Sequence, residues 1–184
     1  NNISIAAVLD QGNLTVHKAR LNTLDGSASA LISAALAQPR PDVTLSSEIK
    51  SINIGKALAS LADENRIDGS GDATLNFTFK GLDADSIQSS LSGKGKFAIK
   101  NGTLRIQLLP EGVGAFSSHR KSEYAFRDIT GSFTAANGKL VNDHIDLSGN
   151  GFSLAGVGTI DMLSKEVSYN GHLTVGEMKD IPFI

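Results

Sequence analysis

Apolar and polar residues alternate along much of this chain. Residues 43–50 read Val-Thr-Leu-Ser-Ser-Glu-Ile-Lys, residues 75–80 read Leu-Asn-Phe-Thr-Phe-Lys, and residues 152–160 continue the alternation. A period of two is typical of β-strands, because successive side chains point to opposite faces of a sheet. The pattern therefore predicts a largely antiparallel sheet with one apolar face and one solvated face.

Short sequences that contain glycine mark the predicted strand reversals. Asn101-Gly102, Asn137-Gly138 and Asn170-Gly171 are dipeptides that favour two-residue type I′ hairpins, and Gln11-Gly12-Asn13 is a looser turn signal. We expect a hairpin turn at each of these four positions.

Two segments have helical spacing. Residues 54–62 carry apolar side chains at i, i+4 and i+7 behind Asn53, a residue type favoured at helix N-caps. A second helix is predicted from an N-cap at Asp83 to Gly93. Its apolar side is predicted to carry Leu82, Ile87 and Leu91. Residues 109–124 lose all periodicity around proline and glycine, which predicts a loop with at most one helical turn.

A ten-residue pattern occurs twice. Gly95–Leu104 and Gly131–Leu140 share Gly-x-Phe-x-x-x-Asn-Gly-x-Leu. We interpret this pattern as a strand-turn-strand module that stacks edge to edge, while chance recurrence of a common hairpin sequence is the alternative. The predicted fold is α+β: a predominantly antiparallel sheet of about ten strands, built from hairpin repeats as a groove or solenoid, with two or three short helices.

Composition limits the function classes. The 184 residues contain 17 Lys and Arg against 19 Asp and Glu, for a net charge of −2, and no Cys. A scattered, balanced charge argues against a nucleic-acid partner, and the lack of Cys excludes disulfides and thiolate metal sites. No apolar stretch reaches the ~20 residues of a membrane helix. Because the chain starts at Asn1 and stops at Ile184 without a polar tail, we expect a fragment of a longer protein.

Candidate catalytic and metal-binding groups are sparse. The four histidines are far apart in sequence, and His144 and Asp146 share one strand face, where a solvated strand edge is the simpler interpretation. Residues 68–72 place oxygen donors as part of a calcium loop does but lack its bidentate Glu. Gly93-Lys94-Gly95-Lys96 fails the spacing of a phosphate-binding loop. We therefore expect no enzyme activity, no metal and no cofactor.

Several short blocks follow one another in a defined order. They are Leu91–Leu104, Phe126–Phe133, Asn137–Asn142, Asp146-Leu147 and Gly156–Asp161. In this order they resemble the AsmA-like proteins of Gram-negative envelopes, best from Ile67 to Val175. We treat residues 1–184 as one domain, with a looser β region and short helix in 1–65 and the best-matching block in 66–184. Residues 105–124 are shorter than the helical insertion usual in that family.

The resemblance implies a location and a role. AsmA-like proteins are periplasmic domains tethered to the inner membrane that take part in outer-membrane biogenesis, so an anchor is expected outside this fragment. Larger relatives are thought to conduct phospholipid along an apolar β groove. The resemblance therefore implies lipid transport and phospholipid acyl chains as the partner, and it names no protein partner.

The predicted apolar face fits three structural arrangements. It is covered by helices, packed on a second sheet, or left as a groove for acyl chains. Two short helices cover only part of a sheet of about ten strands, so an open strip is consistent with the pattern. The residues predicted to line such a groove are Phe77, Phe79, Phe97, Phe133 and Phe152. The simpler interpretation is that these rings form an ordinary core.

Three functions from different classes remain open. The first is a periplasmic lipid-handling or assembly-supporting domain with an apolar groove open to solvent. The second is a non-catalytic structural spacer or assembly module with a sealed core. The third is a surface solenoid that binds or cleaves polysaccharide, which two Tyr and no Trp make the weakest of the three.

Overall fold

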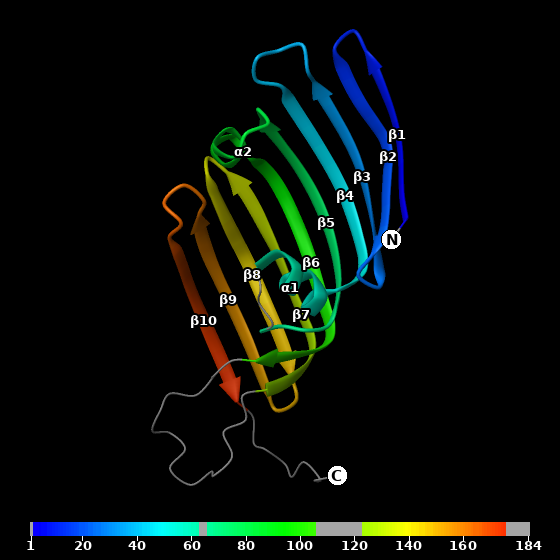
Figure 1. Cartoon of the computed structure of the whole chain (residues 1–184). Helices are drawn as coiled ribbons and strands as arrows, with labels where there is room; N and C mark the ends of the chain where they lie inside the picture. The colour runs from blue at the N-terminus through cyan, green and yellow to red at the C-terminus, as the bar shows by residue number, and fades with distance from the viewer. Residues whose placement is uncertain (1, 63–65, 106–122, 176–184) are drawn as a thin grey trace.

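The computed structural model describes residues 2–62, 66–105 and 123–175, which form ten strands and two helices (Figure 1). In chain order the elements are β1 (Asn2–Asp10), β2 (Asn13–Thr23), β3 (Gly26–Ala35), β4 (Asp42–Asn53), α1 (Ile54–Ala62), β5 (Ser70–Lys80), α2 (Ala84–Ser90), β6 (Ser92–Arg105), β7 (Glu123–Ala136), β8 (Lys139–Gly149), β9 (Phe152–Asp161) and β10 (Val167–Val175). Each strand pairs antiparallel with the strands next to it in sequence, so the strands form one open sheet in the order β1 to β10. The predominantly antiparallel sheet and both predicted helices are confirmed.

The register sorts apolar and polar residues onto opposite faces. In the middle of the sheet Phe97 lies opposite Ala73 and Gly131, whereas the adjacent Lys96 lies opposite Thr74 and Ser132. Cross-strand partners share a face, and this sorting extends over all ten strands, although bulges such as those at Val16/Ala19 and Asn142/Ile145 interrupt the alternation. In the described strands, no charged side chain falls on the apolar face. Apart from two tyrosines, the polar residues on the apolar face of these strands are Thr23, Ser47 and Asn142.

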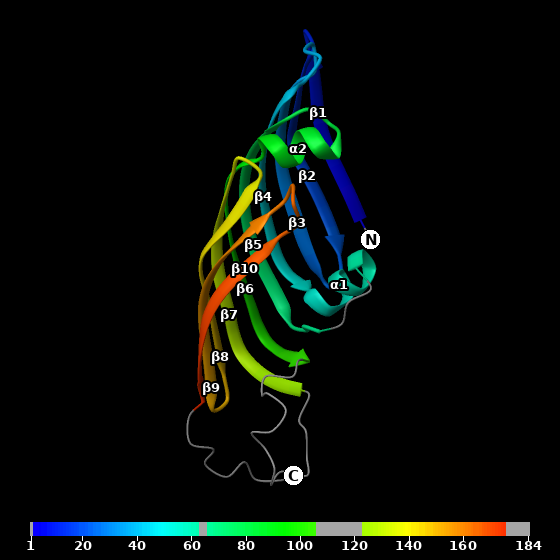
Figure 2. The same cartoon turned by 90° about the vertical axis from the view of Figure 1, so that its left-hand side faces the viewer.

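The sheet is bent along its strands, and α1 lies on the concave side (Figure 2). The side chain of Ile54, at the start of α1, covers the position where a Cβ on Gly71 would lie. Gly71 pairs with Ile52 and Ile99, so it belongs to the apolar face. The apolar face is therefore the concave one, and we call it the concave apolar face.

Burial on this face is greatest in the middle strands. Leu104, Phe126, Ile129 and Leu147 form a buried cluster across β6, β7 and β8. At the β1 edge, Ile5 stays 64% exposed. The edge strand at the other end, β10, is similarly open. The described part of the chain thus has a small core and an apolar surface that remains open toward both ends of the sheet.

Two of the predicted hairpin turns are wrong. Asn101-Gly102 lies inside β6 and Asn170-Gly171 lies inside β10. A type I′ turn needs positive φ at both central residues. Asn137-Gly138 meets this requirement, with φ of 51° and 75°, and forms the β7–β8 turn, as Gln11-Gly12 forms the β1–β2 turn. Asn101 has a φ of 51° but Gly102 is not in the positive region, so the strand continues.

This result also corrects the predicted hairpin repeat. Gly95–Leu104 is part of one continuous strand, whereas Gly131–Leu140 is a strand, a turn and the start of the next strand. The two blocks are therefore not equivalent hairpin modules, although they share a sequence pattern. The Gly-x-Phe parts of the two blocks pair with each other across β6 and β7.

The second helix starts as predicted and ends earlier. The side chain of Asp83 caps α2 by accepting a hydrogen bond from the backbone N–H of Ser86 at 2.8 Å. The helix ends at Ser90, not at Gly93, because β6 already begins at Ser92. Leu82 is 69% exposed and does not belong to a covered helix side. Most of the predicted 109–124 loop lies outside the described residues.

Candidate functional site

The concave apolar face extends across all ten strands. Strands are spaced about 4.8 Å apart, so ten of them make a surface about 43 Å across. The face runs from Ile5 in β1, through Phe97 in β6, to Val167 in β10. An uncharged surface of this extent offers contacts to hydrocarbon and very few to a charged or strongly polar ligand.

The register places all five predicted phenylalanines on this face, on β5, β6, β7 and β9. They are Phe77, Phe79, Phe97, Phe133 and Phe152, and all five are half-buried. Phe77 and Phe133 stack with ring centroids 6.0 Å apart, and Phe152 meets Tyr124 edge-on at 5.8 Å. The structure thus brings these rings together on one surface, and their contact with lipid stays a prediction.

The rings of the middle strands lie over glycines of the neighbouring strands. Gly95 pairs with Phe133, and Phe97 pairs with Gly131, so the two Gly-x-Phe sequences form reciprocal pairs across β6 and β7. A Cβ on Gly131 would lie 2.6 Å from Cζ of Phe97, which shows that the ring covers the glycine. Sequence reasoning did not identify these glycines as site residues. The repeated Gly-x-Phe was the available signal, but only the antiparallel register gives it this meaning.

The polar side chains of the face brace the sheet. Asn142 donates from Nδ2 to the carbonyl oxygens of Ser132 and His144, at 2.7 and 2.9 Å, where β8 bulges. Its Oδ1 atom is buried and has no hydrogen-bond partner within the described residues. Ser47 donates to the carbonyl oxygen of Ser29 at 3.0 Å. Since these donors serve the backbone, the face offers few donors for recognising a polar ligand.

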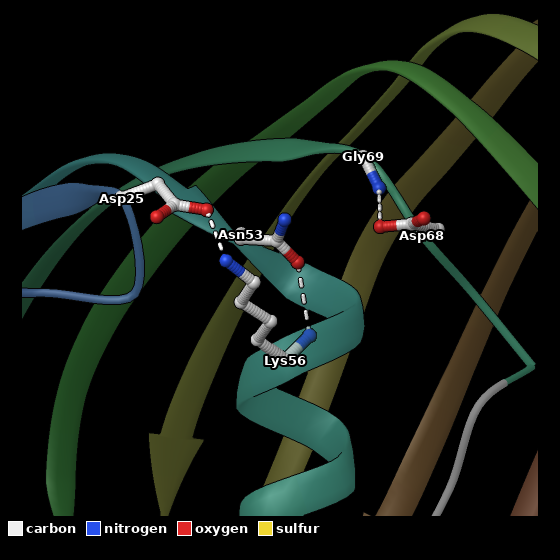
Figure 3. A network of polar contacts seen from close by, with 5 residues as sticks. All are labelled: Asp25, Asn53, Lys56, Asp68 and Gly69. Carbon is white, nitrogen blue, oxygen red and sulfur yellow. Dashed lines mark hydrogen bonds and ion pairs between the residues drawn. The ribbon is translucent and has the colours of Figure 1, made fainter.

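A polar network fixes α1 at one end of the strands (Figure 3). Oδ1 of Asn53 accepts a hydrogen bond from the backbone N–H of Lys56 at 2.9 Å, which confirms the predicted N-cap. Nζ of Lys56 reaches Oδ2 of Asp25, in the β2–β3 turn, at 2.6 Å. Oδ1 of Asp68 accepts from the N–H of Gly69 at 2.8 Å. Helix α1 is therefore anchored to a hairpin turn as well as to β4.

His144 and Asp146, weighed as possible metal ligands, lie on the polar, convex face. Nδ1 of His144 is 3.1 Å from Oγ of Ser132, and Asp146 shares this face as predicted. Both His144 and Asp146 are exposed. Across the described ranges, no three His, Cys, Asp or Glu side chains lie close enough together to hold a metal ion.

Two exposed aspartates have lowered pKa values because they accept backbone hydrogen bonds. The N–H groups of Ser164 and Leu163 lower the pKa of Asp161, which closes the turn between β9 and β10. The N–H of Ser86 lowers the pKa of Asp83 at the start of α2. These carboxylates stabilise local structure, a helix start and a turn.

A model of the AsmA family matches residues 1–145, which include β1 to β7 and part of β8. The chain belongs to the AsmA family. No curated protein and no solved structure matches it. The match confirms the resemblance to the AsmA family. It includes the first 65 residues, where the resemblance was looser, and it ends before the last two of the ordered blocks, Asp146-Leu147 and Gly156–Asp161. Neither helix described in this AsmA-family chain has the length and apolar character needed to cross a membrane.

Proposed function

We propose that this AsmA-family domain binds phospholipid acyl chains on its concave apolar face. By holding or conducting these chains, it supports outer-membrane biogenesis. The observation that carries the proposal is an uncharged, ten-strand apolar surface that the two helices leave largely open. Soluble proteins rarely expose a continuous apolar surface of this size unless it binds something. The proposal assigns no catalytic step, metal or cofactor to the chain.

The energetics favour hydrocarbon as the ligand. Each methylene moved from water onto an apolar surface gains about 0.8 kcal/mol at full burial, so a chain of many methylenes binds without any polar contact. The half-buried rings of Phe77 and Phe133 offer a stacked aromatic surface in the middle of the face. The proposal includes the setting that the family resemblance implies: a periplasmic domain of a protein tethered to the inner membrane, with the tether outside these residues.

Lipid that copurifies with the protein tests the proposal. The chain is produced in a bacterial periplasm and purified without detergent, then examined by native mass spectrometry and by lipid extraction. We expect bound phospholipid in the wild type. The double variant Phe77→Asp/Phe133→Asp puts two carboxylates on the concave apolar face and is expected to lose the lipid while keeping its far-UV circular dichroism spectrum.

The control variant adds the same charge to the same strands on the opposite face. Asn76 and Ala136 are exposed residues of β5 and β7 on the convex side, so Asn76→Asp/Ala136→Asp is expected to retain lipid. A wild type that carries no lipid and takes up no added fluorescent phospholipid would contradict lipid binding. The structural spacer would then be the better interpretation of this domain.

A further inference from the structure

The aromatic rings of the concave apolar face rest on glycines at several places. A Cβ on Gly95 would lie 2.7 Å from Cε1 of Phe133, and one on Gly131 would lie 2.6 Å from Cζ of Phe97. Carbon atoms in contact are normally about 3.5–4.0 Å apart, so neither ring could stay in place beside a larger residue. Each ring lies across the backbone of the next strand because that strand has no side chain at the paired position.

The arrangement continues into β9 and β10. A Cβ on Gly158 would lie 2.5 Å from Cγ of Tyr169, its cross-strand partner in β10. A Cβ on Gly149 would lie 2.6 Å from Cδ1 of Phe152. From β6 to β10 the rings therefore lie along the surface of the sheet and do not stand away from it.

We propose that these glycines are specificity-determining residues. Because they allow the rings to lie flat against the sheet, they keep the concave side of β6 to β9 free. This free space determines how much hydrocarbon the concave apolar face accommodates. This inference rests on the function proposed above and concerns the same surface. In this inference Gly95 and Gly131 determine the depth of the binding surface, although they present no side chain to a ligand.

A Cβ at the position of one of these glycines would displace the ring that lies on it. The atoms that would meet a Cβ at position 95 are the far end of the Phe133 ring and Cδ2 of Leu75, at 3.0 Å. A phenylalanine relieves such a clash by turning about χ1 to another staggered rotamer, because its own backbone need not move. On a one-layer sheet the vacant direction is away from the sheet, so the displaced ring occupies the space that an acyl chain would use.

The test uses Gly95→Ala and a fatty-acid probe, cis-parinaric acid, whose fluorescence rises in an apolar environment. Urea unfolding followed by circular dichroism confirms that each variant is folded before titration. We expect Gly95→Ala to weaken probe binding about fourfold or more, which corresponds to the loss of roughly one buried methylene. Lys96→Ala, the next residue of β6 on the convex face, is the matched control and is expected to bind as the wild type does.

A double variant separates the ring from the glycine. Gly95→Ala/Phe133→Ala removes the displaced ring and is expected to recover much of the binding lost in Gly95→Ala. If Gly95→Ala does not fold, Gly131→Ala makes the same test with Phe97 as the displaced ring. A folded glycine variant that binds the probe like the wild type overturns this inference and leaves lipid binding intact. A wild type that does not bind the probe contradicts the proposed function itself.

Discussion

Two isoleucines on the concave apolar face provide a matched test of how unevenly that face is covered. Ile129 lies in β7 between Ile99 and Leu147 and is 4% exposed, whereas Ile5 lies in the edge strand β1 and is 64% exposed. Replacing either residue with alanine removes the same atoms from the same face. Only the surroundings differ, so the difference between the two variants measures the covering.

The expected magnitudes follow from burial. Removing three carbons from a fully buried side chain costs about 2.4 kcal/mol of transfer free energy, and an unfilled cavity raises this to about 3–4 kcal/mol. We expect that loss in the free energy of unfolding for Ile129→Ala. Ile5 is about one-third buried, so Ile5→Ala should lose only about 0.9 kcal/mol by the same reasoning. The β-propensity change is similar in both variants and largely cancels in the comparison.

Urea unfolding followed by far-UV circular dichroism measures both values, because the chain has no Trp and its strands give the main signal. The slope of the free energy against urea must stay constant, so that the comparison reports stability alone. A difference below about 1 kcal/mol between the variants would refute the reasoning. It would mean that the edge of the face is as well covered in solution as its middle, for example by bound lipid or a second copy.

Three further outcomes follow from single contacts. Asn142→Leu removes the donor to two backbone carbonyls, and urea unfolding should show a loss of about 2 kcal/mol, whereas no loss would mean that the bulge needs no brace. The folded-state pKa of Asp161 is lowered from its usual value of 3.8, so its carboxylate stabilises the fold above that pH, and this contribution disappears as the pH falls through the lowered pKa. Asp161→Asn should therefore flatten the dependence of stability on pH below about pH 4, as acid titrations of unfolding would show; an unchanged acid profile would count against this role. The ion pair of Lys56 and Asp25 is exposed, so Lys56→Met should change stability by less than about 1 kcal/mol, and the change should shrink in high salt. A larger, salt-independent loss at Lys56 would point to a packing role for its side chain.

The sequence alone predicted the features that depend on neighbouring residues. Alternation at residues 75–80 correctly placed Phe77 and Phe79 on one face, because side-chain direction in a strand has a period of two. Asn53 and Asp83 were predicted as N-caps because a cap is a contact within one helical turn. The turn at Asn137-Gly138 was also local.

The same Asn-Gly dipeptide does not form a turn where its strand stays paired with a neighbouring strand. Asn101-Gly102 stays in β6 because this strand continues to pair with β7 as far as Arg105, opposite Glu123. Asn170-Gly171 stays in β10 because it pairs with residues of β9. Local preference cannot predict whether another strand lies alongside, so these two positions required the tertiary structure.

The sequence by itself therefore determined the two-faced strands, the helix starts and the apolar character of the face, because each is a property of residues close together in the chain. Only the tertiary structure decided that this face is concave and incompletely covered. It also decided that Phe97 lies on Gly131 and that Phe133 lies on Gly95. The bend and the ring positions depend on register and on bulges such as the one in β8 near Asn142. Register joins residues from separate strands, and no pattern within one strand specifies it.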